Sequence, residues 1–487
     1  MRVLRLLLIT SLTALTTACA VGPDFMRPDA PDAASYDDEA ALKTVATKTP
    51  YGAAQNMAYG QPLPGQWWEL FQSRPLNDMI TEALLHNPDI EAAVASLRAA
   101  DEDYAAGEGY LFPTVSGSFS STRQKTSGAS FGGGFPSELY TLHNASVSVS
   151  YGIDLFGGTH RAIEQLDAER DYQNFELEAA KLSLTANVVT TAIREASLRG
   201  QIVATKQLIE EQNKQLGIYK SQLDAGGITR LAVLSQQTTL EQTRASLPPL
   251  ELQLVQTRHA LSVLIGQLPS HAPKATFTLE TLHLPEQIPL SVPSQLVEQR
   301  PDIRAAEANL HAASAAIGVA EANRLPQFAI SGDIGSVANQ IGKLFMPGGG
   351  IWSIGASVGE TIFDGGTLAH KQGAAEAQYD AAAALYRKTV LAAFQDVADT
   401  LRALEFDAKT LQAQSDAERA AAESLKLART QFDAGALSYL TLLDSENAEQ
   451  KSRIALVQAE AQRFADTAAL FQALGGGWNS TVKENDK

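Results

Sequence analysis

The chain has 487 residues, 45% of them hydrophobic, and its 38 Lys and Arg against 55 Asp and Glu give a formal charge of −17. Such an acidic chain is a poor partner for nucleic acid, and no internal stretch reaches the roughly 18 apolar residues that a membrane-spanning helix needs. The single cysteine excludes a disulfide framework and a cysteine-based zinc site.

The N-terminus has the features of an export signal. Arg2 and Arg5 precede a short apolar run, and the small residue Ala18 leads to Cys19, the only cysteine. We predict a signal peptide over residues 1–18, because its apolar core is too short to span a bilayer. A cysteine directly after a small residue resembles a lipidation site, so we expect Cys19 to be acylated. Ordinary cleavage beside an incidental cysteine is the alternative.

The segment after the signal peptide is rich in proline. Prolines spaced among Ala, Asp and Gly predict that residues 19–65 form an extended, lipidated tether rather than a packed element. Ala20 stands where an aspartate would retain a lipoprotein in the inner membrane. The lipid is therefore expected to reach the outer membrane, where stable residence needs a second anchor.

The rest of the chain is an internal duplication. We predict a first repeat over residues 66–270, a linker over 271–296, a second repeat over 297–476 and a C-terminal tail over 477–487, with each repeat a structural unit. Four landmarks recur in the same order: residues 86–90 as 299–303, 111–113 as 324–326, 154–158 as 361–366, and 223–226 as 432–435.

Each repeat is expected to contain helices, two strands and a long helical hairpin. Alternating apolar and small polar residues predict the strands, and proline-free stretches over 159–223 and 367–432 predict helices about 100 Å long. A coiled-coil seam is expected along Leu440 and Leu443 and onward, while the Pro248-Pro249 pair is expected to break or kink its helix. The expected strands lie at about 112–123, 143–155, 326–337 and 350–363.

Two short turns join the long helices. Glycine can take a positive φ at a helix C-terminus, and Thr229 and Ser438 can cap the helices that follow. The turns are therefore expected to form ordinary helical hairpins at the end farthest from the strands. Their candidate residues are Asp224, Gly226 and Gly227 in the first turn and Asp433 and Gly435 in the second.

Four strands with a lipid-compatible face cannot close a transmembrane β-barrel alone, and an open sheet edge is not tolerated in hydrocarbon. Several chains must therefore share one barrel, and the long helices must continue from it as a second hollow cylinder. Three chains would give twelve strands, although periodicity alone leaves that number open. The expected fold is mostly α-helical with this shared barrel.

Several motifs together resemble NodT-type outer-membrane efflux lipoproteins, relatives of TolC and OprM. They are residues 19–25 (CAVGPDF), 67–71 (WWELF), 299–307 (QRPDIRAAE), 317–320 (IGVA), 363–366 (FDGG) and 472–478 (QALGGGW). The resemblance implies a homotrimeric TolC-like channel-tunnel, with a 12-stranded shared barrel in the outer membrane and a long α-helical barrel in the periplasm. It implies a periplasmic adaptor and an inner-membrane pump of the RND type as partners.

The resemblance also assigns roles at the hairpin turns. In the family such turns form the periplasmic tip, which meets the helical hairpins of the adaptor. Leu440 and Asp444, which share one helix face, match the positions where an apolar ring and a carboxylate ring narrow the tunnel as a periplasmic gate. Thr441 stands where some relatives carry a second acid, so a two-ring acidic gate is in doubt. The alternative is that Asp444 is a solvated helix charge.

The sequence gives little support for a catalytic function. Residues 355–359 (GASVG) match a nucleophile elbow, but that motif needs a strand-turn-helix corner and here it lies within an alternating strand. The eight histidines are scattered without metal-ligand spacing. No glycine-rich loop precedes the Lys-Ser/Thr of a phosphate site. We therefore expect no enzyme and no cofactor beyond the lipid on Cys19.

Two rival functions remain open at this point. A periplasmic adaptor is also lipidated and coiled-coil, but it would carry one hairpin and a lipoyl-like domain, whereas this chain has two hairpins and amphipathic strands. An outer-membrane exporter of polypeptides, as in type I secretion, shares the expected fold. The lipidation motif and the Arg300-Pro301-Asp302-Ile303 segment favour passive efflux of solutes or drugs.

Overall fold

The computed structural model describes residues 20–37, 42–127 and 136–478. The chain forms two compact units, and each unit draws on both repeats. Unit 1 comprises Met1–Pro28, Leu97–Gln173 and Ala306–Tyr386, and unit 2 comprises Asp29–Ser96, Asn174–Ala305 and Arg387–Lys487. The compact units therefore differ from the expected division into two repeats, because strands of both repeats join one sheet and the long helices contribute to both units.

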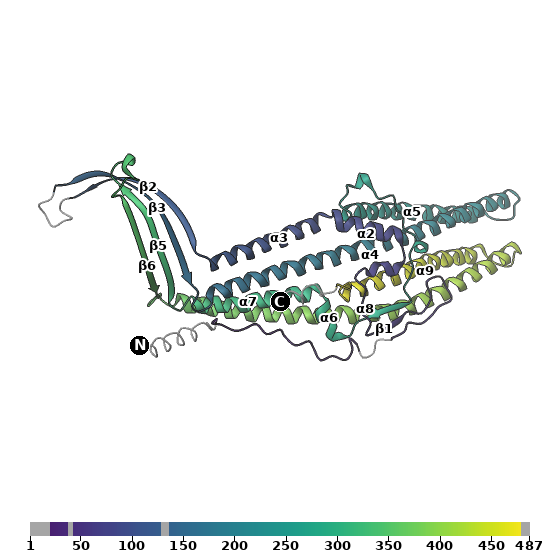
Figure 1. Ribbon diagram of the computed structural model, residues 1–487. Coiled ribbons are helices and arrows are strands. Elements are labelled where there is room, and N and C mark those ends of the chain that lie inside the picture. The colour runs from purple at the N-terminus through teal and green to yellow at the C-terminus, as the bar shows by residue number, and fades with distance from the viewer. Residues whose placement is uncertain (1–19, 38–41, 128–135, 479–487) are drawn as a thin grey trace. The chain divides into compact units, whose positions relative to one another are not determined.

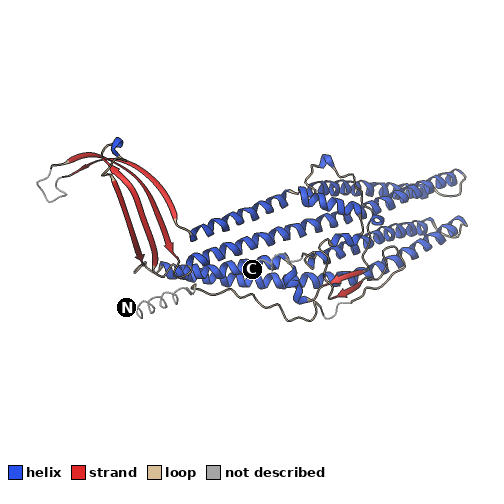
Figure 2. Cartoon of the chain, viewed as in Figure 1, coloured by secondary structure: helices blue, strands red, loops and turns tan. Residues whose placement is uncertain are grey.

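Unit 1 contains a four-stranded antiparallel sheet in the order β2-β3-β5-β6 (Figure 1). Its strands, red in Figure 2, run close to the expected positions, and β3 starts five residues earlier than expected. They are β2 (Thr114–Thr126), β3 (Glu138–Ile153), β5 (Gln327–Ala338) and β6 (Gly350–Gly359).

The strand register places apolar and polar side chains on opposite faces of this sheet. Val147 lies opposite Ile334, which in turn lies opposite Trp352, so apolar side chains share one face. Ser148 lies opposite Asp333, its hydroxyl donates to that carboxylate, and the Ser353 hydroxyl donates to Asp333 at 3.2 Å on the other side. The apolar side chains are exposed: 66% for Ile334 and 77% for Trp352. Alternation thus gives one apolar and one small polar face.

In chain order, the helices before and after the strands of this sheet come in matching pairs. α3 (Pro88–Glu108) and α7 (Pro301–Ala322) lead toward the strands. α4 (Gly158–Asp224) and α8 (Thr367–Asp433) follow them, and each has 67 residues. The return helices α5 (Arg230–Leu264) and α9 (Tyr439–Ala473) have 35 residues each. These equal lengths agree with the internal duplication. None of the helices in the described ranges is both long and apolar enough to cross a bilayer.

The proline pair was expected to break or kink the return helix of the first repeat, and the expectation of a break is wrong. α5 continues through Pro248 and Pro249 without interruption. Both prolines are exposed to solvent. Water can therefore bind the backbone carbonyls that lose their helical partners, which removes most of the penalty for the missing hydrogen bonds.

The expected tether is also packed in part. Residues 56–59 form β1 (Asn56–Tyr59), which pairs in parallel with β4 (Gln287–Leu290) inside the expected linker. Met57 and Leu63 are buried, and so are Phe277 and Ile288 of the linker. The prediction that residues 42–65 form an extended, unpacked tether is thus wrong. Residues of the expected linker, about 230 positions later in the chain, pair with this segment. Cys19 and the signal peptide lie outside the described residues.

The core of unit 2 begins near the N-terminus with a short 3₁₀-helix over Trp67–Phe71. Trp67 and Phe71 are fully buried and contact Phe471 of α9, with ring centroids 5.7 and 6.1 Å apart. Two short α-helices of this unit, α2 (Arg74–His86) and α6 (Pro293–Gln299), precede α3 and α7 in the chain. This aromatic cluster ties the N-terminal segment to the end of α9.

Candidate functional site

The two turns between the long helices have the same backbone structure. Gly226 has φ 76° and Gly435 has φ 72°. The Gly227 N–H donates to the Gln222 carbonyl at 2.7 Å, and the equivalent bond in the second turn runs from Ala436 to Gln431 at 2.8 Å. Both turns are therefore Schellman motifs, in which glycine occupies the left-handed position at low cost.

The helices after the turns begin with the expected caps. The Thr229 side chain accepts a hydrogen bond from the Ala232 N–H, and the Ser438 side chain accepts one from the Thr441 N–H. The predicted hairpins are thus confirmed as local structure. Gly227, which was grouped with Gly226, does not have a positive φ. The backbone conformation at this position therefore does not require glycine.

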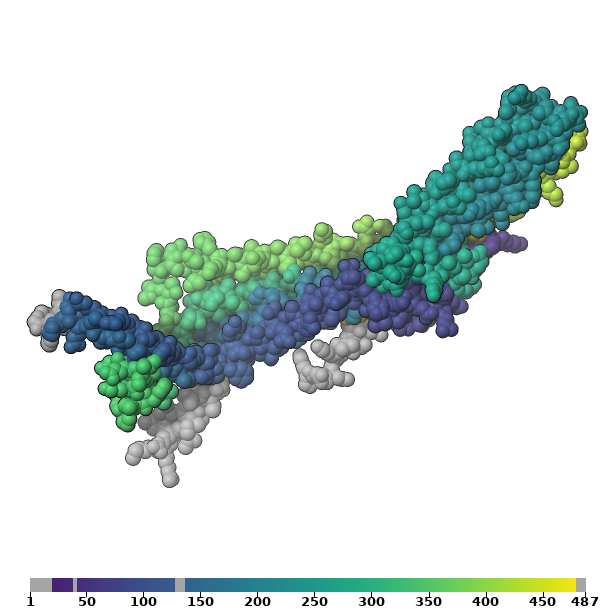
Figure 3. All heavy atoms as spheres, turned by 90° about the horizontal axis from the view of Figure 1, so that it is seen from above, coloured from purple at the N-terminus to yellow at the C-terminus, as the bar shows by residue number. Residues whose placement is uncertain are grey.

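An apolar cluster of unit 2 packs the two hairpins together next to their turns. Tyr219 is fully buried, and its ring lies 5.6 Å from Phe432 and 5.2 Å from Tyr439, centroid to centroid. The Tyr439 hydroxyl donates to Gln236 Oε1 at 2.9 Å across the hairpins. In Figure 3 the teal atoms of the first hairpin lie against the yellow atoms of the second. The remaining buried members are Leu216, Val233, Leu240, Leu425, Ala428 and Leu442.

The expected gate residues lie on the surface of α9. Leu440 is 65% exposed and Asp444 is exposed one turn later, whereas Leu442 between them is fully buried. The two side chains therefore share one outward face, and the chain's own core contacts neither of them extensively. The predicted seam through Leu440 and Leu443 is wrong at this end of α9, because Leu442 faces the cluster instead.

At this end of α9, two glutamates are buried instead of the expected apolar residues of a coiled-coil seam. Glu446 and Glu449 are 3% and 4% exposed, and both oxygens of Glu446 and one of Glu449 have no hydrogen-bond partner. Burial raises the pKa of the Glu446 carboxyl, and Arg429, whose Nη2 lies 3.7 Å from Glu446 Oε1, opposes that shift. Burial likewise raises the pKa of Glu449, opposed by Arg453. A polar layer thus interrupts the apolar packing of this end of the bundle.

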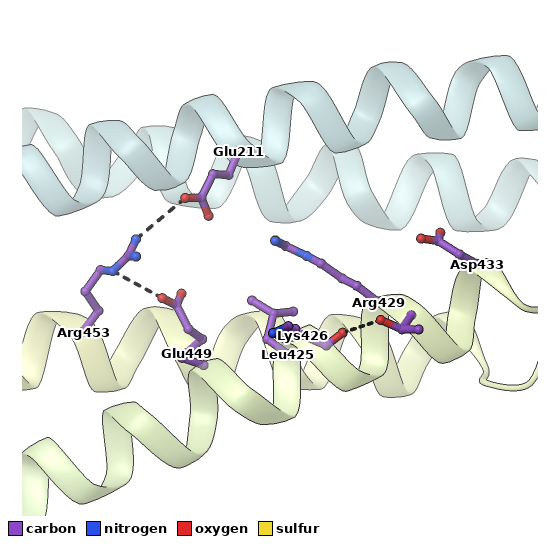
Figure 4. Close-up of a pocket in the computed structure, with 9 residues that line it drawn as sticks. Glu211, Leu425, Lys426, Arg429, Asp433, Glu449 and Arg453 are labelled. Atoms are coloured by element: carbon purple, nitrogen blue, oxygen red, sulfur yellow. Dashed lines mark hydrogen bonds and ion pairs between the residues drawn. The ribbon is translucent and has the colours of Figure 1, made fainter.

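This polar layer borders an open groove of about 390 Å³ between the hairpins (Figure 4). Arg453 lies between two acids, with its Nε 3.2 Å from Glu449 on the same helix and its Nη1 3.9 Å from Glu211 on α4. Lys426, Arg429 and Asp433 of α8 also line the groove. Sequence reasoning missed these residues, because an SENAEQKSR segment has the composition of a solvated helix face and its burial comes from side chains of other helices.

The other chemical candidates do not form sites. Ser357 of the GASVG segment lies inside β6 opposite Ala329, without the strand-turn-helix corner of a nucleophile elbow. Among the residues that the structure describes, no three His, Cys, Asp or Glu side chains come together in a way that could hold a metal ion.

Comparison with known proteins places these features in a family. Residues 79–267 and 292–476 match the family model described as outer membrane efflux protein. The chain is 29% identical over 430 residues to the pyoverdine export outer membrane protein OpmQ of Pseudomonas putida, covering 86% of this chain and 90% of that protein. It is 29% identical over 487 residues to the outer membrane protein OprJ of Pseudomonas aeruginosa, covering 96% and 95%. The solved structure of the outer-membrane channel OprN has a TM-score of 0.86 at 27% identity, over 94% of this chain and 100% of that one.

Proposed function

The chain belongs to the outer membrane efflux protein family, and on that premise we propose that three copies of it form a passive channel for solutes or drugs across the outer membrane. Its fold is that of the TolC-like channel-tunnels, and the protein resides in the outer membrane. A periplasmic adaptor and an inner-membrane pump would deliver the cargo and supply the energy.

The four-stranded sheet carries this proposal. One face presents exposed apolar side chains such as Phe119, Ile334 and Trp352, while the other presents Ser, Gly and Asp. An exposed apolar face suits lipid, a small polar face suits a water-filled lumen, and the two edge strands need partners in hydrocarbon. Three such sheets would supply twelve strands, within the range of outer-membrane barrels.

The hairpin turns support a second part of the proposal. We assign the periplasmic tip to the turns at Asp224–Gly227 and Asp433–Gly435, where an adaptor would dock, and the gate to Leu440 and Asp444. Both gate side chains are exposed on one face of α9, as side chains that line a lumen must be. We further propose that Cys19 carries the lipid, since it is the only cysteine of the chain.

The function can be tested with the purified protein in detergent and in planar bilayers. Native mass measurement is expected to give three chains, and the trimer is expected to conduct ions without nucleotide. Ile354→Lys places a charge on the apolar face and should reduce insertion, because such a charge costs roughly 2–4 kcal/mol at the bilayer centre.

The matched control is Ser353→Lys, one residue away on the polar face, which should insert and conduct. A protein that is monomeric in every detergent and forms no channel would contradict the proposal. Equal insertion of the two lysine variants would contradict the assignment of the two faces.

A further inference from the structure

The polar face of the sheet in unit 1 carries almost no charge. Within its four strands, all of which the structure describes, the register brings only two Asp, Glu, Lys or Arg side chains to this face, Glu138 and Asp333. Glu138 is the first residue of β3, whereas Asp333 lies near the middle of β5. Arg123 and Lys125 of β2 belong to the apolar face by the same register. Asp333 is therefore the one charge in the interior of the polar face of these strands.

The Asp333 carboxylate is held by a hydroxyl from each neighbouring strand. Ser148 of β3 donates to its Oδ1, and Ser353 of β6 donates to its Oδ2 at 3.2 Å. An ionised carboxylate has about four acceptor sites, so each oxygen can still accept from water. Asp333 is half-buried and Ser353 is exposed. The carboxylate is thus fixed in position between three strands and remains in contact with solvent.

Cross-strand pairing alone does not require a charge at this position. Ser118 and Ser146, which lie opposite each other on the same face, form a hydroxyl–hydroxyl hydrogen bond at 2.9 Å. Such neutral pairs stabilise a sheet, whereas aspartate is depleted in strands. A carboxylate that faced hydrocarbon would also be costly. The position of Asp333 therefore suits a face that borders water, and its charge exceeds what strand pairing needs.

We propose that Asp333 is a specificity-determining residue of the channel, which favours cationic over anionic solutes in the part of the lumen that the sheets line. Three symmetric copies would place three Asp333 carboxylates at one level of that lumen. A ring of carboxylates attracts cations and repels anions. The inference rests on the proposed trimeric channel and adds a residue that sets its ion preference. It is separate from the proposed gate, because Asp444 belongs to unit 2.

The width of the lumen determines how this ring acts. The side chains of an eight-stranded barrel fill its interior, so a twelve-stranded barrel leaves room for water between the carboxylates. Charges in water are screened over a Debye length, which is roughly 30 Å in about 0.01 M salt and roughly 3 Å in about 1 M salt. The ring therefore influences ions across the lumen in dilute salt and only next to the wall in concentrated salt. A narrow filter would keep its preference in both.

Reversal potentials of the full-length protein in planar bilayers test the proposal. They are measured in the Asp444→Ala background, so that the proposed gate ring contributes no charge. Asp333→Asn keeps the size of the side chain and one acceptor oxygen but removes the charge. The K⁺/Cl⁻ permeability ratio should fall at least about twofold in about 0.01 M KCl and change little in about 1 M KCl.

An exchange of two side chains separates the charge from the hydrogen bonds that it makes. Asp333 and Ser353 lie opposite each other, so Asp333→Ser combined with Ser353→Asp moves the carboxylate to β6 on the same face. It can then no longer bridge to Ser148, which lies on the other side of β5. The exchanged variant should keep the cation preference of the parent. Loss of the preference in this variant would overturn the assignment to the charge.

Chemical modification gives a test that does not depend on how a charge variant folds. Asp333→Cys adds one cysteine to a chain whose only other cysteine is Cys19. On inserted channels, a methanethiosulfonate reagent that carries a sulfonate should restore the cation preference, and one that carries a trimethylammonium group should reverse it. The matched control is Ile334→Cys, the next residue, whose side chain belongs to the apolar face. Neither reagent should change its permeability ratio.

The outcomes separate the role of Asp333 from the function. An unchanged ratio in Asp333→Asn in dilute salt, or no effect of either reagent on Asp333→Cys, would overturn the specificity role and leave the proposed channel standing. A parent chain that forms no channel would overturn both. A reduced ratio in Asp333→Asn that the sulfonate reagent restores in Asp333→Cys would support both.

Discussion

Leu440 and Asp444 are exposed on α9, whereas Leu442 and Glu446 on the same helix are buried. In a symmetric trimer each would form a ring of three around one axis. An apolar ring can block flow by dewetting, and a carboxylate ring attracts cations. We therefore expect Asp444→Ala to raise single-channel conductance and to weaken block by divalent cations in planar bilayers, whereas Leu440→Ala should raise conductance with little effect on cation block.

The control for this pair is Asp416→Ala, an exposed acid of α8 farther from the turn. It should change neither quantity if the effect belongs to the gate. Unchanged conductance and unchanged divalent block in Asp444→Ala would instead identify Asp444 as a solvated helix charge, with the constriction elsewhere.

Single residues could be predicted from the sequence where their structure is local. Gly226, Gly435, Thr229 and Ser438 adopt the predicted turn and cap geometry, because a Schellman motif and an N-cap depend on a few consecutive residues. Glu446 could not be predicted, since the side chains that bury it come from other helices. The sequence shows a carboxylate among polar neighbours, and only the packed hairpins make it a buried one.

At the scale of elements, α9 holds the N-terminal segment as well as the second hairpin. Arg463 is fully buried, and its guanidinium donates to the carbonyl of Ala53 at 3.0 Å, to Gln55 Oε1 at 3.0 Å, and to the carbonyl of Tyr51. One turn earlier, Thr49 donates to Glu460 at 3.4 Å. A strap of residues 42–59 is thus fixed on α9 by buried polar contacts.

The strap gives α9 a pH-dependent stability. Burial raises the pKa of Glu460 from 4.5 to about 7. A raised pKa means that the folded protein binds this proton more tightly than the unfolded chain. The stabilising contribution of the Glu460 carboxyl to the free energy of unfolding is therefore complete below about pH 4.5. It is lost as the pH rises to about 7. Glu460→Gln should stabilise the protein at about pH 8 by at most roughly 3 kcal/mol and have little effect near pH 4.

Thermal unfolding in detergent, followed by helical circular dichroism at the two pH values, measures this difference. Glu423→Gln, an exposed glutamate of α8, is the matched control and should leave stability unchanged at both. Destabilisation by Glu460→Gln at the higher pH would show that the carboxylate is held in its charged form by favourable contacts.

Long elements were predictable and short ones were not. The 67-residue helices follow from proline-free, alanine-rich periodicity, which accumulates over many turns. β1 and β4 have four residues each and pair across about 230 residues of chain. A strand of that length has no periodic signal of its own, and its existence depends on a partner that local sequence does not identify.

At the scale of the whole molecule, the channel would have two kinds of membrane anchor. A single lipid chain gives only marginal membrane binding, whereas a closed sheet is a permanent one. Cys19→Ser should therefore lose labelling by a clickable fatty acid and still insert into the outer membrane and conduct. Equal labelling of parent and variant would contradict lipidation at Cys19, and failure of an exported variant to insert would contradict independent anchoring by the sheet.

The duplication and the fold class could be predicted from the sequence, because landmark motifs and strand alternation repeat in order. The compact units could not, since they cut across both repeats. Which segments of a long helix share a unit depends on what packs beside each stretch, and the chain order of the motifs does not contain that information.

The equal lengths of the paired helices also limit how the chain can change in evolution. α4 and α8 have 67 residues each, α5 and α9 have 35 each, and one apolar cluster joins both turns. An insertion of seven residues in each helix of one hairpin alone would displace its turn by about 10 Å relative to the other. The Tyr219, Phe432 and Tyr439 rings would then separate. Insertions and deletions in these helices should therefore be inherited in matched sets of four, one for each helix, so that homologues differ in hairpin length by coordinated steps.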